Sequence, residues 1–278
     1  MPNKRTILPR VREYEFSGAK LNYRVIGSGK PVILLHGSMI ADPWGGFEKL
    51  LARYYQVYLP ELPGFGASET VPGRVHDTQL FGEALTEFAI VTGLTRAPVI
   101  AFSLGTVVAI RAAAGKGIKG KLVMVGMPIR LESRLLEKIM RLPLPARHAL
   151  AANEITRSGL LLATLKEIIG IADKAFAPKY LKLLNTTDPR AMVDANLIEE
   201  VEKDLPWLIQ QVKNPMWFVY GEHDKLKTGA EKWLKRKIHI IRGAGHDVFV
   251  SRPRETLRLI RLYLEPGGFW YRIWEKIR

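Results

Sequence analysis

Ser103 is the residue whose surroundings most strongly suggest chemistry. The apolar run of residues 99–102, typical of a buried strand, ends at this serine, and a helix-forming run begins directly after it. A serine on a sharp strand-to-helix turn carries its hydroxyl out of the sheet, where it can act as a nucleophile. Such a turn needs small residues two positions before and after the serine, and Ala101 and Gly105 meet this need. The segment therefore predicts a nucleophile at Ser103, with a simple helix N-cap as the alternative.

An acid and a histidine follow along the chain in the order that such a serine requires. A buried-strand pattern at residues 216–220 is followed by Asp224, and a second one at residues 238–241 is followed by His246. Open α/β sheets place their chemistry at the carboxyl ends of the strands. A serine hydroxyl is a weak nucleophile unless a histidine takes its proton and an acid orients that histidine. We therefore predict that Ser103, Asp224 and His246 form a catalytic triad.

The loop after an earlier strand pattern provides candidate oxyanion donors. Residues 31–35 form an apolar run, and Ser38 follows three positions later. Acyl transfer to serine needs backbone N–H groups that point at the oxygen on which negative charge develops. One donor is expected in this loop and the other directly after the nucleophile. We assign them to Ser38 and Leu104, with Met39 as the substitute if the loop register differs by one residue.

Strand and helix patterns alternate along most of the chain. Residues 11–26 predict a β-hairpin that turns at Ser17 and Gly18. The alternation that follows predicts a mostly parallel sheet covered by helices on both faces. Further strands are expected at residues 31–35, 56–59, 99–102, 121–125, 216–220 and 238–241, and helices near residues 46–54, 78–91 and 104–114.

The strand pattern is interrupted after residue 128. From residue 129 to residue 212 the sequence shows helical segments separated by prolines. An all-helical insert between two strands of a sheet is expected to form a cap over the active site. We therefore predict a core domain of residues 1–127 and 214–278 and a helical cap of residues 128–213.

Three residues on loops near the predicted triad are candidates for substrate contact. Met39 lies in the oxyanion loop, Phe65 lies in a glycine-rich loop, and Trp44 lies shortly before a predicted helix. Trp44 could equally pack beneath its own loop.

These segments together resemble the capped serine hydrolases of the α/β-hydrolase superfamily. The resemblance covers residues 11–264 and implies the α/β-hydrolase fold, with a mostly parallel eight-stranded sheet and an all-helical cap. Ala101 and Glu61 depart from the family pattern, which usually has glycine and aspartate at these places. Serine at position 103 argues against dehalogenases and most epoxide hydrolases, whose nucleophile is aspartate. The motifs are Leu35-His36-Gly37-Ser38, Leu62-Pro63-Gly64-Phe65-Gly66-Ala67-Ser68, Ala101-Phe102-Ser103-Leu104-Gly105, Gly221-Glu222-His223-Asp224 and Gly245-His246.

The leading functional hypothesis is hydrolysis of small-molecule carboxylic esters through an acyl-enzyme on Ser103, without a cofactor. Two alternatives stay open from the resemblance. Capped members of the superfamily with similar loops hydrolyse carbon–carbon bonds of vinylogous diketones, and other members are ligand receptors that keep a triad. Ester turnover that depends on Ser103 would distinguish an enzyme from a receptor.

Other polar residues near these motifs have expected structural roles. His36 is expected to hold the oxyanion loop, whereas His223 and Asp247 adjoin predicted catalytic residues and should point elsewhere. Glu222 is the nearby substitute for Asp224. The six histidines lack the spacing of metal ligands, so no metal site is predicted.

Composition narrows the class of protein. Of 278 residues, 47% are hydrophobic, which is enough for a sizeable core. Cysteine is absent, which excludes disulfides and thiolate catalysis. This composition, without an apolar run typical of a secretory signal or a membrane span, predicts a cytoplasmic protein. The net charge of +15 is explained by a basic, well-solvated surface, and as an alternative by attraction of anionic lipid or acidic substrates. No nucleic-acid-binding motif is recognisable, and no nucleic-acid partner is expected.

The segment of residues 269–278 is amphipathic. Trp270, Ile273, Trp274 and Ile277 would share one face of a helix, with basic residues opposite. Such a helix can lie in a membrane interface. It can equally dock onto the body of the protein or onto a second subunit.

Overall fold

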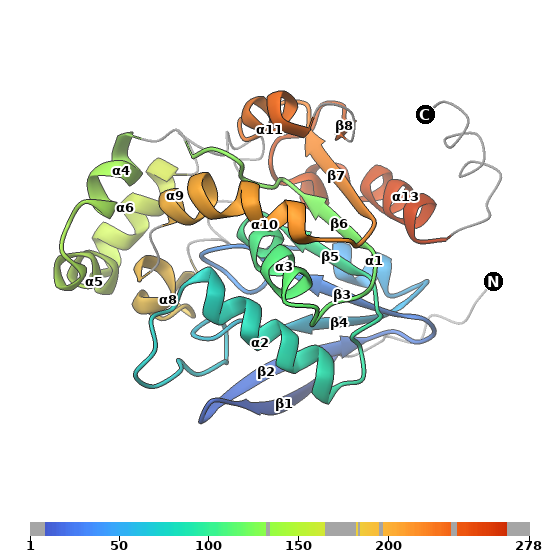
Figure 1. The fold of residues 1–278 in the computed structure, drawn as a ribbon, viewed down its shortest axis with the longest axis horizontal. Coiled ribbons are helices and arrows are strands. Elements are labelled where there is room, and N and C mark those ends of the chain that lie inside the picture. Colours follow the sequence, from blue (N-terminus) through green and yellow to red (C-terminus); the bar gives the residue numbers. More distant parts are fainter. Residues whose placement is uncertain are drawn as a thin grey trace.

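The computed structural model of the protein describes residues 9–131, 134–164, 182, 184–194, 197–234 and 238–265. Its centre is an eight-stranded sheet with helices on both faces (Figure 1). The strands are β1 (Arg10–Phe16), β2 (Ala19–Ile26), β3 (Pro31–Leu35), β4 (Gln56–Pro60), β5 (Val99–Phe102), β6 (Leu122–Val125), β7 (Met216–Gly221) and β8 (Ile238–Ile241).

The order of the strands is β1-β2-β4-β3-β5-β6-β7-β8. β1 and β2 form the predicted antiparallel hairpin, with Ser17 and Gly18 in its turn, and β2 pairs antiparallel with β4. From β4 to β8 every pairing is parallel. The predicted α/β-hydrolase fold is therefore confirmed.

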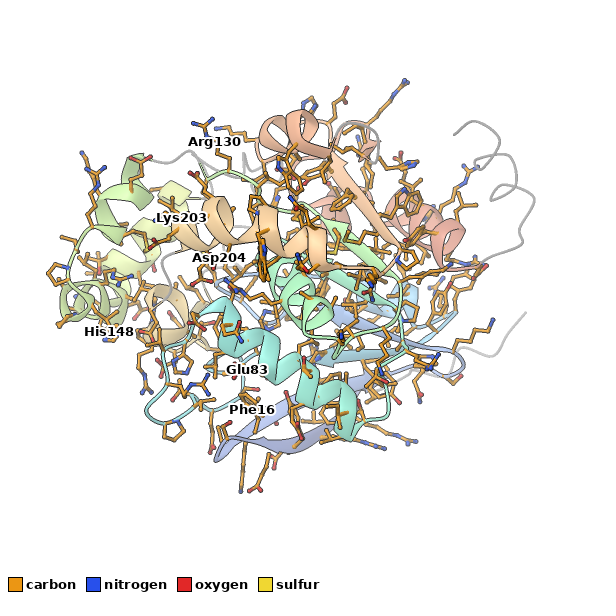
Figure 2. The ribbon with its side chains drawn as sticks, in the orientation of Figure 1. Phe16, Glu83, Arg130, His148, Lys203 and Asp204 are labelled. Carbon is orange, nitrogen blue, oxygen red and sulfur yellow. The ribbon has the colours of Figure 1, made fainter. Side chains whose placement is uncertain are left out.

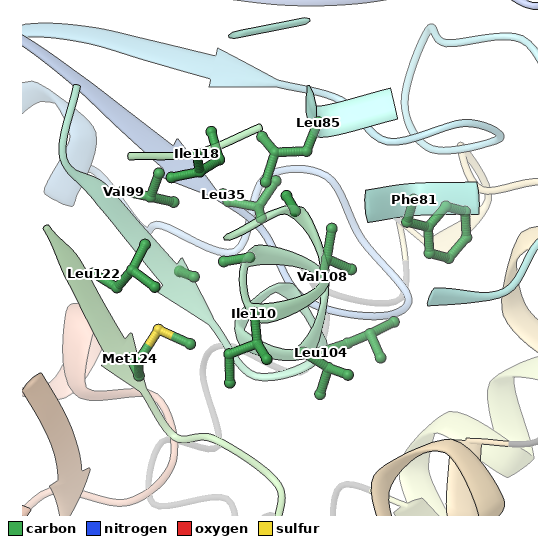
Figure 3. Close-up of a cluster of buried hydrophobic side chains, with 14 of the residues drawn as sticks. Leu35, Phe81, Leu85, Val99, Leu104, Val108, Ile110, Ile118, Leu122 and Met124 are labelled. Carbon is green, nitrogen blue, oxygen red and sulfur yellow. The ribbon is translucent and has the colours of Figure 1, made fainter. Parts of the chain in front are cut away.

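The inner strands are buried on both faces, as their continuous apolar sequences predict for a parallel sheet. Along β3, Ile33 and Leu35 face one apolar cluster, whereas Val32 and Leu34 face the other. Figure 3 shows the first cluster, in which Met124 of β6 lies among side chains from neighbouring strands and from the helices on that face. This two-sided packing holds the strand ends, and the loops that follow them, in fixed positions.

Helices of the core cover the two faces of the sheet. In Figure 1, α2 and α3 lie on the near face, while α1 and α13 lie behind the sheet. Asp77 begins α2 by accepting a hydrogen bond from Leu80 N over 2.8 Å, which satisfies one free N–H of the first turn. The helices are α1 (Phe47–Leu51), α2 (Thr78–Val91), α3 (Leu104–Ala114), α11 (Lys227–Leu234), α12 (Val248–Ser251) and α13 (Pro253–Leu264).

Between β6 and β7, the described residues form helices and connecting turns. In Figure 1, α4, α5, α6 and α8 gather at the left side of the molecule, whereas α10 lies over α3. They fall within the predicted cap of residues 128–213, whose boundaries stay a prediction. The helices are α4 (Arg134–Met140), α5 (Leu144–Ala152), α6 (Glu154–Thr164), α8 (Pro189–Val193), α9 (Leu197–Glu199), the π-helix η2 (Glu200–Asp204) and α10 (Leu205–Gln211).

Two carboxylates fasten these helices to the beginning of α2. Asp194 accepts a hydrogen bond from His76 N over 3.0 Å, and Glu200 accepts one from Thr78 N over 3.0 Å. Asp194 also lies 2.6 Å from His148 Nε2, so it connects α5 to the core as well (Figure 2). Because α2 packs against the sheet through its apolar face, both carboxylates link the helices between β6 and β7 to a rigid part of the core.

None of the helices within the described residues has the length and hydropathy that crossing a bilayer requires. The amphipathic segment of residues 269–278 lies outside the described residues.

Candidate active site

Parallel pairing brings four loops together at one edge of the sheet. β3, β5, β7 and β8 run in the same direction, so the residues after their carboxyl ends meet at that edge. Ser103 directly follows β5, whereas Asp224 and His246 lie on the loops after β7 and β8. Ser38 follows β3. The fold thus gathers the predicted site residues from positions far apart in the sequence.

Ser103 occupies a strained turn between β5 and α3. Its φ is 51° and its ψ is −122°, a conformation that L-residues rarely adopt. Its N–H donates to Val125 O over 2.9 Å, which ties the turn to β6. The Ser103 side chain stands at the N-cap position of α3 but makes no capping hydrogen bond. A helix cap therefore does not explain this serine.

Glycine is required on both sides of the contact between this turn and the oxyanion loop. A Cβ on Gly105 would come within 2.2 Å of His36 O, and a Cβ on Gly37 would come within 2.9 Å of Ser103 Cβ. The absence of these side chains lets the two loops touch. Ser38 is half-buried, and no acceptor among the described residues takes its N–H. The loop after β3 thus lies beside Ser103 with an N–H group available to a ligand.

His36 stabilises the loop from beneath. The His36 ring accepts a hydrogen bond from Leu62 N at Nε2 over 3.0 Å, so Nδ1 carries the proton and donates to Gly37 O over 2.7 Å. Burial lowers the pKa of His36 to about 4, which keeps the ring neutral. These contacts agree with the structural role expected for His36.

The buried neutral His36 should make stability depend on pH. In the unfolded chain His36 binds a proton below its ordinary pKa of 6.5, whereas the folded protein keeps it neutral down to about pH 4. The contribution of His36 to the free energy of unfolding is therefore complete above pH 6.5. We expect a loss of about 3 kcal/mol from this group as the pH falls to 4, at roughly 1.4 kcal/mol per pKa unit.

Urea unfolding of the wild-type protein and of His36→Gln, measured from pH 8 to pH 4, tests this expectation. The stability difference between the two proteins should shrink across this window because glutamine does not titrate. A difference that stays constant with pH would show that His36 titrates alike in the folded and unfolded chains.

Asp224 and His246 form a buried pair. His246 Nδ1 lies 2.9 Å from Asp224 Oδ2, and both residues are 2% exposed. The other carboxylate oxygen, Oδ1, accepts a hydrogen bond from Leu226 N over 3.0 Å, which fixes the plane of the carboxylate. Glu222, the alternative acid, is exposed and instead accepts a hydrogen bond from Gly243 N over 2.8 Å. The geometry therefore favours Asp224 over Glu222 as the partner of His246.

The second ring nitrogen of His246 is left without a partner. His246 Nε2 is buried and makes no hydrogen bond to the described residues, including Ser103 Oγ. Because Nδ1 faces a carboxylate and donates its proton there, Nε2 is an acceptor in the neutral form of the ring. A buried acceptor without a donor costs free energy and calls for an explanation. Accepting a proton from a nucleophile or ligand is such an explanation, since catalytic hydrogen bonds often tighten only in the complex.

Gly126 makes room for this pair next to the serine turn. It follows β6 with a φ of 60°, directly after the residue whose carbonyl binds Ser103 N. A Cβ at this position would lie 2.6 Å from His246 Cε1 and 3.3 Å from Asp224 Oδ2. The Phe102 ring packs against the His246 ring with a centroid distance of 4.8 Å. β5 and β6 together thus place the histidine against the ring of Phe102, the residue directly before Ser103.

The three predicted substrate contacts lie in different surroundings. Met39 is half-buried in the loop after β3, whereas Trp44 and Phe65 are 0% exposed. Trp44 packs in the core behind the sheet, with its ring 5.2 Å from that of Phe249. Phe65 packs with His36 at 4.9 Å between ring centroids. This burial gives no support to substrate contact by Trp44 or Phe65, and for Trp44 it matches the alternative of packing beneath its own loop.

The two departures from the family pattern have local explanations. Ala101 is fully buried in the core cluster, where its methyl group fits. Glu61 Oε2 accepts a hydrogen bond from Ala67 N over 2.8 Å, and a Cβ on Gly66 would meet the same carboxylate. Glu61 therefore organises the turn of its own loop, and the longer side chain is accommodated by glycine.

Two contacts of the site were missed by the sequence analysis. Gly126 could have been noticed, because it directly follows a predicted strand at the same edge of the sheet. Thr187 donates a hydrogen bond to Met39 O over 2.5 Å and is separated from it by 148 residues. No local pattern marks such a contact.

Among the described residues, no group of three or more histidine, aspartate or glutamate side chains is arranged to hold a metal ion. What the site offers is a hydroxyl, an imidazole with a free nitrogen, a buried carboxylate and free backbone N–H groups. These are the parts that acyl transfer to serine requires.

Known proteins are similar to this chain in sequence and in fold. The chain is 35% identical over 124 residues to a 2-hydroxy-6-oxononadienedioate/2-hydroxy-6-oxononatrienedioate hydrolase of Pseudomonas putida, a match that covers 42% of this chain and 43% of that protein. It is 25% identical to the pimeloyl-[acyl-carrier protein] methyl ester esterase of Aeromonas salmonicida over 86% of this chain and 96% of that protein. A thermophilic esterase from Thermogutta terrifontis has a similar structure, with a TM-score of 0.71, 19% identity, and coverage of 94% of this chain and 98% of that one.

The model of one family matches residues 32–259, which include every strand from β4 to β8 and all the predicted site residues. The chain belongs to the alpha/beta hydrolase family.

Proposed function

We propose that the protein is a serine hydrolase that cleaves carboxylic esters through an acyl-enzyme on Ser103. The observation that carries the proposal is the buried Asp224–His246 pair, whose free Nε2 lies at the same sheet edge as a serine in a strained turn. Strained backbone and unpaired buried groups are costly, and they persist where function requires them.

The proposed reaction starts with attack of Ser103 Oγ on the ester carbonyl carbon. His246 Nε2 takes the hydroxyl proton, and the carbonyl oxygen becomes an oxyanion that accepts hydrogen bonds from Ser38 N and Leu104 N. Collapse of this intermediate breaks the ester C–O bond, and His246 returns the proton to the leaving alkoxide. Asp224 keeps the imidazole in the tautomer with a free Nε2 and stabilises its protonated form. Water then attacks the acyl-enzyme in the same manner and regenerates Ser103.

The substrate class is proposed from the relatives. The methyl ester esterase matches almost its whole length, whereas the P. putida hydrolase matches over less than half of its length. This difference favours an ester as the substrate. Hydrolysis of a carbon–carbon bond is the second candidate, supported by the higher identity within the shorter match.

Labelling with a fluorophosphonate, followed by turnover of p-nitrophenyl esters, tests the proposal. We expect the label on Ser103, located by peptide mass spectrometry, and hydrolysis of short-chain esters that stops when the label is complete. A series of acyl chain lengths then defines the pocket. Turnover of a ring-fission dienoate that exceeds ester turnover would replace the ester assignment by the carbon–carbon hydrolase. Absence of both label and turnover would favour the receptor alternative.

A further inference from the structure

The segment before α8 touches the loop that carries Ser38, a predicted oxyanion donor, and Met39, its substitute. Thr187 Oγ1 donates a hydrogen bond to Met39 O over 2.5 Å. Thr187 is 3% exposed, so water does not compete freely for this bond. The contact joins the helices between β6 and β7 to the residue directly after Ser38. It is therefore a candidate for coupling these helices to the chemistry of the site.

The Thr187 hydroxyl is held in place by the residues that follow it. Asp188 N donates to Gly64 O over 2.7 Å, and Asp188 Oδ1 accepts from Arg190 N over 2.8 Å as the N-cap of α8. A further hydrogen bond to the core, from Asp188 N, thus directly follows the one that Thr187 makes. These contacts fix the beginning of α8, and they thereby fix the position of the Thr187 hydroxyl.

The acceptor of this bond belongs to a strained turn. Ile40 N donates to Ser38 O over 3.0 Å, which is the i to i+2 hydrogen bond of a γ-turn centred on Met39. The φ of Met39 is 73°, and a γ-turn with positive φ is the rare, strained form. Methionine has a Cβ and no special ability to adopt this conformation. Interactions outside the turn are therefore needed to maintain it.

The turn determines the direction in which the N–H of Met39 points. Because peptide units are planar and trans, the carbonyl of Ser38 and the N–H of Met39 point in opposite directions. The γ-turn engages that carbonyl, and the Thr187 hydroxyl engages the next one, at Met39. The N–H that these two units orient is that of Met39, the substitute oxyanion donor, because the N–H of Ile40 closes the γ-turn. Loss of either hydrogen bond would let the Met39 N–H turn away from the oxygen bound at Ser103. Oxyanion stabilisation depends on donors that are aligned before the reaction.

We infer that Thr187 is a positioning residue that holds the oxyanion loop in its active conformation from the side of the helices between β6 and β7. This inference rests on the proposed function of Ser103 and deepens it. The orientation of the Met39 N–H then depends on the docking of α8, so these helices contribute to the rate of the chemical step.

Comparison of Thr187→Val with Thr187→Ser tests the role of the hydroxyl. Valine keeps the shape and removes the donor. We expect kcat for a p-nitrophenyl ester to fall about 10- to 50-fold, less than the roughly 100- to 1,000-fold loss on removal of a donor itself. KM should change by less than about 2-fold, because a misaligned donor is missed mainly in the transition state. Serine keeps the donor and should restore kcat to within about 3-fold of wild type.

An inhibitor that forms an oxyanion provides a second readout. Ser103 Oγ adds to the carbonyl carbon of a trifluoromethyl ketone, its proton passes to His246, and the carbonyl oxygen becomes the bound oxyanion. Affinity for this inhibitor should fall in Thr187→Val by the same factor as kcat. A change that only loosened the fold would lower the melting temperature without this parallel loss.

Thr70→Val is the matched control. It removes a threonine hydroxyl from the same interface, where Thr70 Oγ1 accepts from Arg190, and it leaves the oxyanion loop untouched. We expect its kcat and inhibitor affinity to stay within about 2-fold of wild type. Equal effects of Thr187→Val and Thr70→Val, or a failure of Thr187→Ser to restore kcat, would overturn the inference.

The outcome is distinguishable from failure of the proposed function. If Ser103→Ala abolishes turnover while Thr187→Val leaves it intact, only the positioning role is wrong. If Ser103→Ala leaves turnover intact, the proposed function is wrong, and the inference about Thr187 falls with it.

Discussion

Replacement of Ser103 by alanine is expected to lower kcat for a p-nitrophenyl ester by about 100,000-fold or more, as for other serine hydrolases that lose the nucleophile. Alanine removes the only atom that forms the acyl-enzyme. It keeps the Cβ of residue 103, against which Gly37 packs closely, so the packing of the turn should persist. Steady-state kinetics with purified protein measures the effect, and thermal unfolding checks that the fold is retained.

The double variant Ser103→Ala/His246→Ala gives the control for a concerted mechanism. The two side chains act in one proton transfer, so the double variant should be about as inactive as either single variant. If the loss of kcat in the double variant equalled the product of the two single losses, the two residues would act independently. Retention of more than a tenth of wild-type turnover in Ser103→Ala would rule out an acyl-enzyme at this position.

Asp224→Asn is expected to lower kcat about 1,000- to 10,000-fold through the tautomer of His246. Leu226 N donates to Asp224 Oδ1, and this contact requires an oxygen at that position in the variant. The amide nitrogen of asparagine is then directed to His246 Nδ1. The ring must accept at Nδ1 and carry its proton on Nε2, where it can no longer take the proton of Ser103. Since the side chain keeps its size, the loss should fall on kcat, measured with the same ester.

Glu222→Gln is the matched control for this change, because Glu222 is exposed on the same loop. It makes its hydrogen bond to Gly243 N and not to His246. Its kcat should remain within about 2-fold of wild type. A loss in Glu222→Gln as large as in Asp224→Asn would assign the acid to Glu222.

Several features of the fold were predictable because they depend on the pattern of apolar residues within short segments. The strand patterns placed β3 and β5 correctly, since a strand buried on both faces needs an uninterrupted apolar run. α2 and α3 begin and end where the patterns predicted. α1 is shorter than the predicted residues 46–54, and spans Phe47–Leu51. Helix ends are decided by capping and by tertiary contacts, which apolar spacing does not report.

The part of the candidate site that depends on strand topology could be predicted from the sequence. Once the strands are parallel, residues after their carboxyl ends must share one edge, which brings Asp224 to His246. The choice between Asp224 and Glu222 was not decided by sequence, because both lie on the same loop and have the same chemistry. It took the position of His246 Nδ1 in space to distinguish them.

The sequence by itself determined the positions of the strands along the chain, the sharp turn at Ser103 and the chain order of Ser103, Asp224 and His246. Only the tertiary structure decided that Trp44 is a core residue, that Gly126 leaves space for His246, and that Thr187 reaches Met39. The first group depends on backbone geometry and on apolar periodicity within a few neighbouring residues. The second depends on pairs of atoms that meet only after distant elements have packed, so no local pattern records them.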